Sequence, residues 1–121
     1  MPRITLIFHN EAYSSERLAA DANRQLFEEF VTWIDSLEAR GLYDGSDALA
    51  PNSTANTVRR RGEAVAIDGP FAETHEAING FVTVLVADRA AALALAAECP
   101  GLKYGMAVEV RELLDVIKPG R

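Results

Sequence analysis

The sequence predicts an α+β fold, in which a ferredoxin-like split βαβ sheet carries two helices on one face. Three observations indicate this fold: strand-like segments with alternating or continuous apolar residues, two segments with helical periodicity, and the order strand, helix, strand, strand, helix, strand. The chain has 121 residues, which is the length of one domain. We therefore expect residues 1–121 to form a single domain.

The first strand and the first helix are each predicted from the period of their apolar residues. Arg3 to Phe8 reads as a strand with apolar side chains on both faces, which is typical of a central strand. A helix is expected from Ser15 to Arg40, with Gly41 in the position that commonly follows a helix end. Its apolar stripe should pack on the sheet and consists of Leu26, Phe27, Phe30, Val31, Trp33, Ile34 and Leu37.

The middle of the chain mixes turn formers with short extended segments. Leu42 to Ala50 contains several turn-forming residues and is interpreted as a loop with a short extended piece. Thr57 to Arg61 and Glu63 to Ile67 flank Gly62, which predicts a hairpin. Three consecutive arginines in its first strand must alternate between faces, which favours a charged, solvated edge over a basic patch.

The last third of the chain predicts a strand, a helix and a final strand. Phe81 to Val86 is the most apolar strand and is expected to be buried on both faces. Asp88 can cap an alanine-rich helix from Ala90 to Glu98. In the final strand, Met106 to Leu113, Glu109 and Arg111 should face away from the core.

The apolar character of the central strands also predicts a homodimer. Two helices cover only one face of a sheet, yet the first strand and the Phe81 strand carry apolar side chains on both faces. A second copy of the chain is the simplest cover for the other face, because twofold dimers are the commonest oligomers. We expect two sheets packed face to face as a dimeric α/β barrel that encloses a cavity.

Composition narrows the possible partners and locations. The net charge of −6 disfavours nucleic-acid binding, which depends on clustered Lys and Arg. No apolar run approaches the length of a signal or of a membrane span, so we expect a cytoplasmic protein without a membrane partner. Cys99 is the only cysteine and is expected to be a small buried residue.

The segment Asp68 to Thr74 marks an abrupt exit from a strand. Gly69-Pro70 cannot continue a ladder, so the strand should stop near Asp68, whose carboxylate can accept hydrogen bonds from the following turn. Together with three later segments it resembles the YCII-related superfamily, and specifically its DGPF branch. The matching segments are Asp68-Gly69-Pro70-Phe71-Ala72-Glu73-Thr74, Gly80-Phe81, Glu98-Cys99-Pro100-Gly101 and Val108-Glu109-Val110-Arg111.

This resemblance spans Ile4 to Leu113 and implies a ferredoxin-like fold that dimerises into an α/β barrel. It also implies a link to extracytoplasmic-function sigma factors, near which members of the branch are often encoded, and no established activity. In some members of the wider superfamily the suggested chemistry uses a histidine on the first helix paired with an aspartate. The predicted helix Ser15–Arg40 contains no histidine, so that pair is not carried over. His75 stands where the branch often has lysine, and His9 where it frequently has other polar residues.

The candidate chemistry is an acid/base pair of Asp68 and His9, both at the ends of strands. A carboxylate that orients an imidazole gives a proton acceptor near neutral pH. The pair would act on a small molecule in a cavity near Asp68, as a lyase or isomerase would. Phe71, Arg59 and Phe81 are the candidate ligand contacts, Arg59 because an inward arginine can pair with an anion.

Other function classes remain open beside this one. Asp68 can serve only to stabilise its turn, and the whole domain can be a noncatalytic regulatory or interaction module. A metal site would draw on His9, His75, Asp68, Glu73 and Glu76, but these residues lack the helical histidine spacing of zinc hydrolases, so no metal is expected. No glycine-rich phosphate loop is present, so no nucleotide cofactor is expected either.

Overall fold

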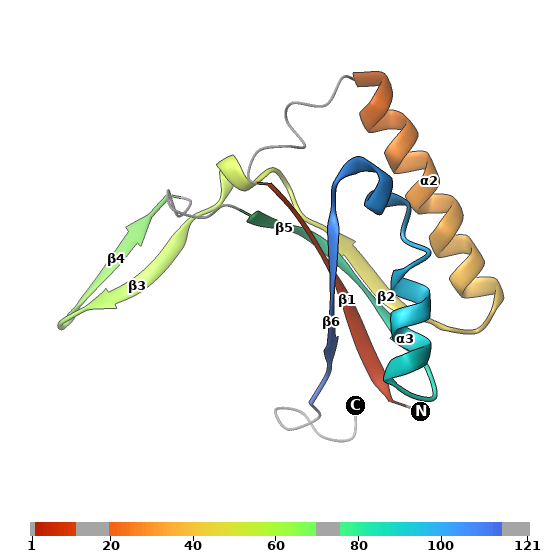
Figure 1. Cartoon of the computed structure of the whole chain (residues 1–121). Helices are drawn as coiled ribbons and strands as arrows, with labels where there is room; N and C mark the ends of the chain where they lie inside the picture. Colours follow the sequence, from red (N-terminus) through yellow and green to blue (C-terminus); the bar gives the residue numbers. More distant parts are fainter. Residues whose placement is uncertain (1, 12–19, 70–75, 115–121) are drawn as a thin grey trace.

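A four-stranded antiparallel sheet with two helices on one face forms the body of the protein (Figure 1). The computed structural model describes residues 2–11, 20–69 and 76–114. The strands lie in the order β2-β5-β1-β6, so β5 lies between β1 and β2, which are connected through the first helix. This topology is compatible with the predicted ferredoxin-like fold. Its elements are β1 (Arg3–Glu11), α2 (Ala20–Ala39), β2 (Tyr43–Ala48), β5 (Glu76–Leu85), α3 (Arg89–Ala96) and β6 (Ala107–Glu112).

The core lies between the helices and one face of the sheet. Alternate residues of β1 point toward the helices, and Ile4, Leu6 and Phe8 are buried there. Phe8 packs edge-on against Phe30 of α2, with ring centroids 5.1 Å apart, and against Trp33 at 6.1 Å. These contacts confirm the prediction that the stripe of the long helix packs on the sheet.

The stripe of α2 is narrower than the sequence predicts. Phe27 and Val31, expected to pack on the sheet, expose 66% and 45% of their surface. They border a groove of about 670 Å³ between α2 and the strands β2 and β5, which we call the α2–β2 groove. Its apolar lining includes Leu26, Phe27, Phe30, Val31, Ile34 and Leu49.

The second helix begins where its capping residue predicts. The Asp88 carboxylate accepts a hydrogen bond from the backbone N–H of Ala91 at 2.9 Å, and α3 follows directly. After α3, Cys99 is buried as expected, and burial raises the pKa of its thiol. The free cysteine is therefore a packing residue held in its thiol form.

One strand of the sheet comes from a segment that the sequence analysis interpreted mainly as a loop. Leu42 to Ala50 contains β2, which forms the edge of the sheet beside β5, with an irregular register between Tyr43 and Ser46. Its turn-forming residues are tolerated because an edge strand is paired on one side only. Gly80 of β5 allows the close approach, since a Cβ atom there would lie 2.5 Å from the backbone oxygen of Asp47.

The predicted hairpin forms, but it lies outside the main sheet. Strands β3 (Thr57–Arg61) and β4 (Ala64–Asp68) pair as a separate two-stranded sheet, joined at Gly62 with φ of +64°. Figure 1 shows this ribbon extending away from the sheet and from α2. Strand β4 ends at Asp68, as predicted, and the three arginines are exposed on alternate faces.

The face of the sheet opposite the helices is partly buried. Val82, Val84 and Val86 are buried against the helices, whereas Phe81 and Leu85 on the other face are half-buried. The expectation that this strand is fully buried on both faces is therefore met on one face only. In the described part of the chain, no helix is long and apolar enough to span a membrane.

Candidate functional site

The face of the sheet that α2 and α3 leave uncovered carries a cluster of polar side chains from β1, β5 and β6. We call it the open face. Directly opposed residues of paired strands share a face, so the pairs between β1, β5 and β6 show which residues lie on the open face. On β1, β5 and β6 they are Thr5, Ile7, His9, Phe81, Thr83, Leu85, Ala107, Glu109 and Arg111.

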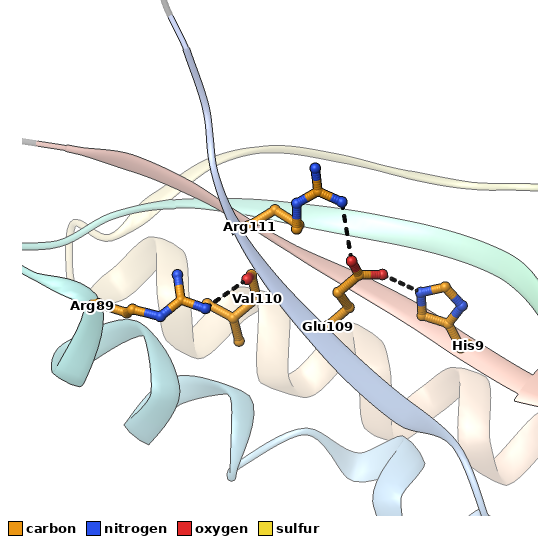
Figure 2. A network of polar contacts seen from close by, with 5 residues as sticks. All are labelled: His9, Arg89, Glu109, Val110 and Arg111. Carbon is orange, nitrogen blue, oxygen red and sulfur yellow. Dashed lines mark hydrogen bonds and ion pairs between the residues drawn. The ribbon is translucent and has the colours of Figure 1, made fainter.

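At one end of this face, His9 bonds to Glu109, which also bonds to Arg111 (Figure 2). His9 Nε2 lies 2.7 Å from Glu109 Oε1, and Arg111 Nη1 donates to Glu109 Oε2 at 3.1 Å. The register explains the contact between His9 and Glu109. Glu109 lies opposite Ile7 of β1, so it is a diagonal neighbour of His9 on the same face. The Glu109 carboxylate thus lies between the imidazole of His9 and the permanent cation of Arg111. We call these three residues the trio.

A register shift between β1 and β5 lies beside His9. Phe8 pairs with Gly80 and His9 pairs with Ile78, so the extra residue, Asn79, belongs to β5. Such irregularities often lie beside functional sites. The side chain of His9 is 19% exposed, compared with 40% for Glu109 and 66% for Arg111. The imidazole is therefore the most shielded member of the trio, while still accessible to a small molecule.

The surroundings keep Glu109 ionised. The hydrogen bond with His9, followed by the hydrogen bond from Arg111, lowers the pKa of Glu109 below its ordinary value. An ionised carboxylate beside an imidazole orients the ring. The trio therefore has the parts of an acid/base centre: a proton acceptor, a carboxylate that orients it, and a cation.

Beside the trio, the open face has a pair of threonine hydroxyls and apolar side chains. Thr83 Oγ1 donates to Thr5 Oγ1 at 3.4 Å, and both residues are buried. Ile7 lies between Phe81 on one neighbouring strand and Glu109 on the other. An aromatic or aliphatic group placed over Ile7 and Phe81 would therefore lie next to the carboxylate of the trio.

The structure does not bring His9 and Asp68, the predicted pair, together. Asp68 belongs to the ribbon, where its carboxylate accepts from Arg61 Nη2 at 3.2 Å, and its side chain is 48% exposed. Arg59, a predicted ligand contact, lies on the same ribbon and is exposed. Phe81, another predicted contact, shares the open face with His9.

The other predicted residues fall outside the described part of the chain. Phe71, a predicted ligand contact, and His75 and Glu73, weighed as metal ligands, lie in the segment 70–75. Among the described residues, no three His, Cys, Asp or Glu side chains gather as metal ligands would.

The sequence analysis missed Glu109 and Arg111 as site residues. It placed both on the outer face of the final strand, which is correct, but it had no means of pairing that strand with His9. The available signal was the alternation Val108-Glu109-Val110-Arg111, which puts two opposite charges on one face of a strand.

Comparison with known proteins gives one result. A search of curated proteins finds no significant match. The family model of the YCII-related domain matches residues 5–116, which include all but the first two residues of β1 and every later described helix and strand. The chain therefore belongs to the YCII-related family.

Proposed function

We propose that this YCII-related chain binds a small carboxylate-bearing compound on its open face, where His9 exchanges a proton with it. The observation that carries the proposal is the 2.7 Å contact between His9 Nε2 and Glu109 Oε1. A histidine held by an ionised carboxylate can take up and return a proton near neutral pH. Such a site suits proton abstraction next to a carbonyl group, the first step of many lyase and isomerase reactions.

The surroundings of His9 favour a particular class of ligand. Arg111 supplies a positive charge that attracts a carboxylate. Ile7 and Phe81 supply an apolar surface that suits an aromatic or short aliphatic body. The ligand site is proposed at His9 rather than near Asp68, because Asp68 is an exposed residue of the ribbon that already bonds to Arg61.

The proposal includes a homodimer of the DGPF branch, in which two open faces enclose the ligand. Half-buried Ile7, Phe81 and Leu85 lie on a face that neither α2 nor α3 covers. A second sheet packed on this face would exclude water from the site and strengthen its electrostatic interactions. Light scattering of the purified chain at micromolar concentration is expected to give the mass of a dimer, and a monodisperse monomer would contradict this part.

The test uses a panel of small aromatic and aliphatic carboxylic acids and detects binding by NMR. Binders are expected to shift the imidazole signals of His9, which are assigned by their loss in His9→Gln. Arg111→Gln should weaken this binding about tenfold or more, because it removes the cation that attracts the ligand carboxylate. Glu112→Gln, which changes an exposed carboxylate on the same strand, should leave it unchanged. Binding that is as strong in Arg111→Gln and His9→Gln as in the wild type would overturn the proposed site.

A second readout separates catalysis from binding alone. A bound acid that also carries a ketone should exchange the hydrogen next to that ketone for deuterium in D₂O, because His9 removes the proton and leaves an enolate, and His9→Gln should abolish the exchange. If the acid binds at His9 without exchange, the chain is a noncatalytic binding module. That outcome would overturn the proton-transfer part of the proposal.

A further inference from the structure

The ribbon formed by β3 and β4 lacks the support that hairpins usually have. It consists of five opposed residue pairs from Thr57↔Asp68 to Arg61↔Ala64, and it forms a sheet separate from the other strands. A two-stranded ribbon alone in water is marginally stable, and stable ones pack on a third strand or on another surface. Figure 1 shows the ribbon pointing away from α2 of its own chain. Because no third strand of the described residues joins the ribbon, we look for its packing partner in a second copy of the chain.

One face of the ribbon is apolar and exposed. Val58 lies opposite Ile67, and Arg60 lies opposite Val65, two positions further along, so all four side chains share a face. Val58, Val65 and Ile67 expose 63%, 67% and 69% of their surface. Three branched apolar side chains exposed side by side are typical of a contact surface. We call this face the arm face.

The α2–β2 groove is an exposed apolar surface on the same chain. Phe27 and Leu49, which line it, are 66% and 53% exposed, and the groove has a volume of about 670 Å³. Among the described residues that line it, Asp47 carries the only charge. The groove is thus apolar with an acidic residue in its wall, and no lining lysine or arginine would repel an arginine.

The charges of the two surfaces are complementary. The ribbon has three consecutive arginines, Arg59 to Arg61, and two carboxylates, Glu63 and Asp68, so its net charge is positive. Helix α2 carries a net negative charge: Arg24 bonds to Asp21 at 2.8 Å, Glu29 bonds to Lys103 and Tyr104, and the remaining carboxylates are Glu28, Asp35 and Glu38. Among the described residues that line the groove itself, the carboxylate is that of Asp47. A net positive ribbon is attracted to such a helix and is repelled by another ribbon.

We propose that two copies of the chain exchange arms, with the arm face of each packed into the α2–β2 groove of the other. Val58, Val65 and Ile67 fill the apolar groove, and Arg60 lies near Asp47, the acidic residue of its wall. The exchange is reciprocal, so this interface closes on itself as a twofold dimer. It uses neither His9 nor Glu109, so it stands independently of the proposed acid/base site.

The first experiment tests the contact by chemical cross-linking of full-length variants. Val65→Cys places a thiol on the arm face and Phe27→Cys places one in the groove, while the natural Cys99 is buried and stays unreactive. The two variants are mixed and treated with a short bismaleimide. A cross-linked dimer containing one chain of each kind is expected. Leu93→Cys, on the exposed side of α3, is the matched partner for the control mixture and should give far less product.

Three results of this experiment would overturn the proposal. One is equal cross-linking of Val65→Cys to Phe27→Cys and to Leu93→Cys. Another is efficient cross-linking of Val65→Cys to itself, which would show that the arms pair with each other. The third is an absence of cross-linking in a sample that remains monomeric at every concentration, which would assign the arm face to a different protein.

Sedimentation equilibrium gives the second measurement and separates this interface from the open face. The double variant Val58→Ser/Ile67→Ser is expected to raise the dimer dissociation constant about tenfold or more, since it removes two apolar contacts from the interface. Leu93→Ser is the control for loss of an exposed apolar side chain. A dimer that is unaffected by the double variant would overturn the arm exchange. The proposed function would be untouched, because binding of carboxylic acids at His9 is measured separately.

Discussion

His9 and Glu109 are 100 positions apart in the chain, yet His9 Nε2 lies 2.7 Å from Glu109 Oε1 on the open face of the sheet. The antiparallel pairing of β1 with β6 makes the two residues diagonal neighbours. Arg111, two residues further along β6, completes the trio.

The stability contributed by Glu109 should depend on pH. The pKa of Glu109 is lowered in the folded chain, chiefly by the hydrogen bond with His9 and then by that with Arg111. The ionised form therefore stabilises the fold above the ordinary glutamate value, and this contribution is lost as the pH falls through the lowered pKa. The difference in free energy of unfolding between the wild type and Glu109→Gln should shrink as the pH is lowered from about 6 to about 3.

Urea unfolding at a series of pH values measures this difference. Glu112→Gln is the control, because it removes a carboxylate of β6 that forms no part of the trio. A stability difference for Glu109→Gln that stays constant or grows on acidification would show that the carboxylate gains nothing from His9 and Arg111.

Asp68→Ala should have little effect on stability. The Asp68 carboxylate lies 3.2 Å from Arg61 Nη2, with the two side chains 48% and 65% exposed. Surface ion pairs of this kind contribute about 0 to 1 kcal/mol. Denaturant unfolding should therefore show a loss below about 1 kcal/mol. A loss of about 2 kcal/mol or more would instead mean that Asp68 satisfies buried N–H groups of the following turn.

Gly80→Ala should loosen the edge strand. A Cβ atom at Gly80 would lie 2.5 Å from the backbone oxygen of Asp47, so β2 must shift relative to β5. A loss of about 1 to 3 kcal/mol in the free energy of unfolding is expected from such overpacking. Gly69→Ala is the matched control, because no atom lies within 4 Å of the added Cβ. Equal stability of the two variants would contradict the close approach of β2 and β5.

Asp88→Ala should weaken the start of α3. The Asp88 carboxylate accepts from the N–H of Ala91 at 2.9 Å, and loss of such a cap costs about 0.5 to 2 kcal/mol. Asp88→Asn keeps an acceptor at this position and should retain most of the stability. Thermal unfolding of the three proteins measures the order. If Asp88→Asn were as unstable as Asp88→Ala, the hydrogen bond would not be the source of the effect.

The sequence by itself determined those elements whose cause is local. Apolar residues on both faces of β1 predicted a central strand, Asp88 predicted the start of α3, and Gly62 predicted the turn of the ribbon. The stop at Asp68 followed from Gly69-Pro70. In each case the deciding interactions act between residues a few positions apart, so a short stretch of sequence is enough to predict the element.

Only the tertiary structure decided how distant segments pair. It made β2 an edge strand, because hydrogen bonds to β5 outweigh the turn preference of its own residues. It separated the ribbon from the main sheet, and so placed Asp68 and His9 in different sheets. It also gave His9 the partner Glu109, because the register between β1 and β6 depends on the packing of the whole sheet and not on any short stretch of sequence.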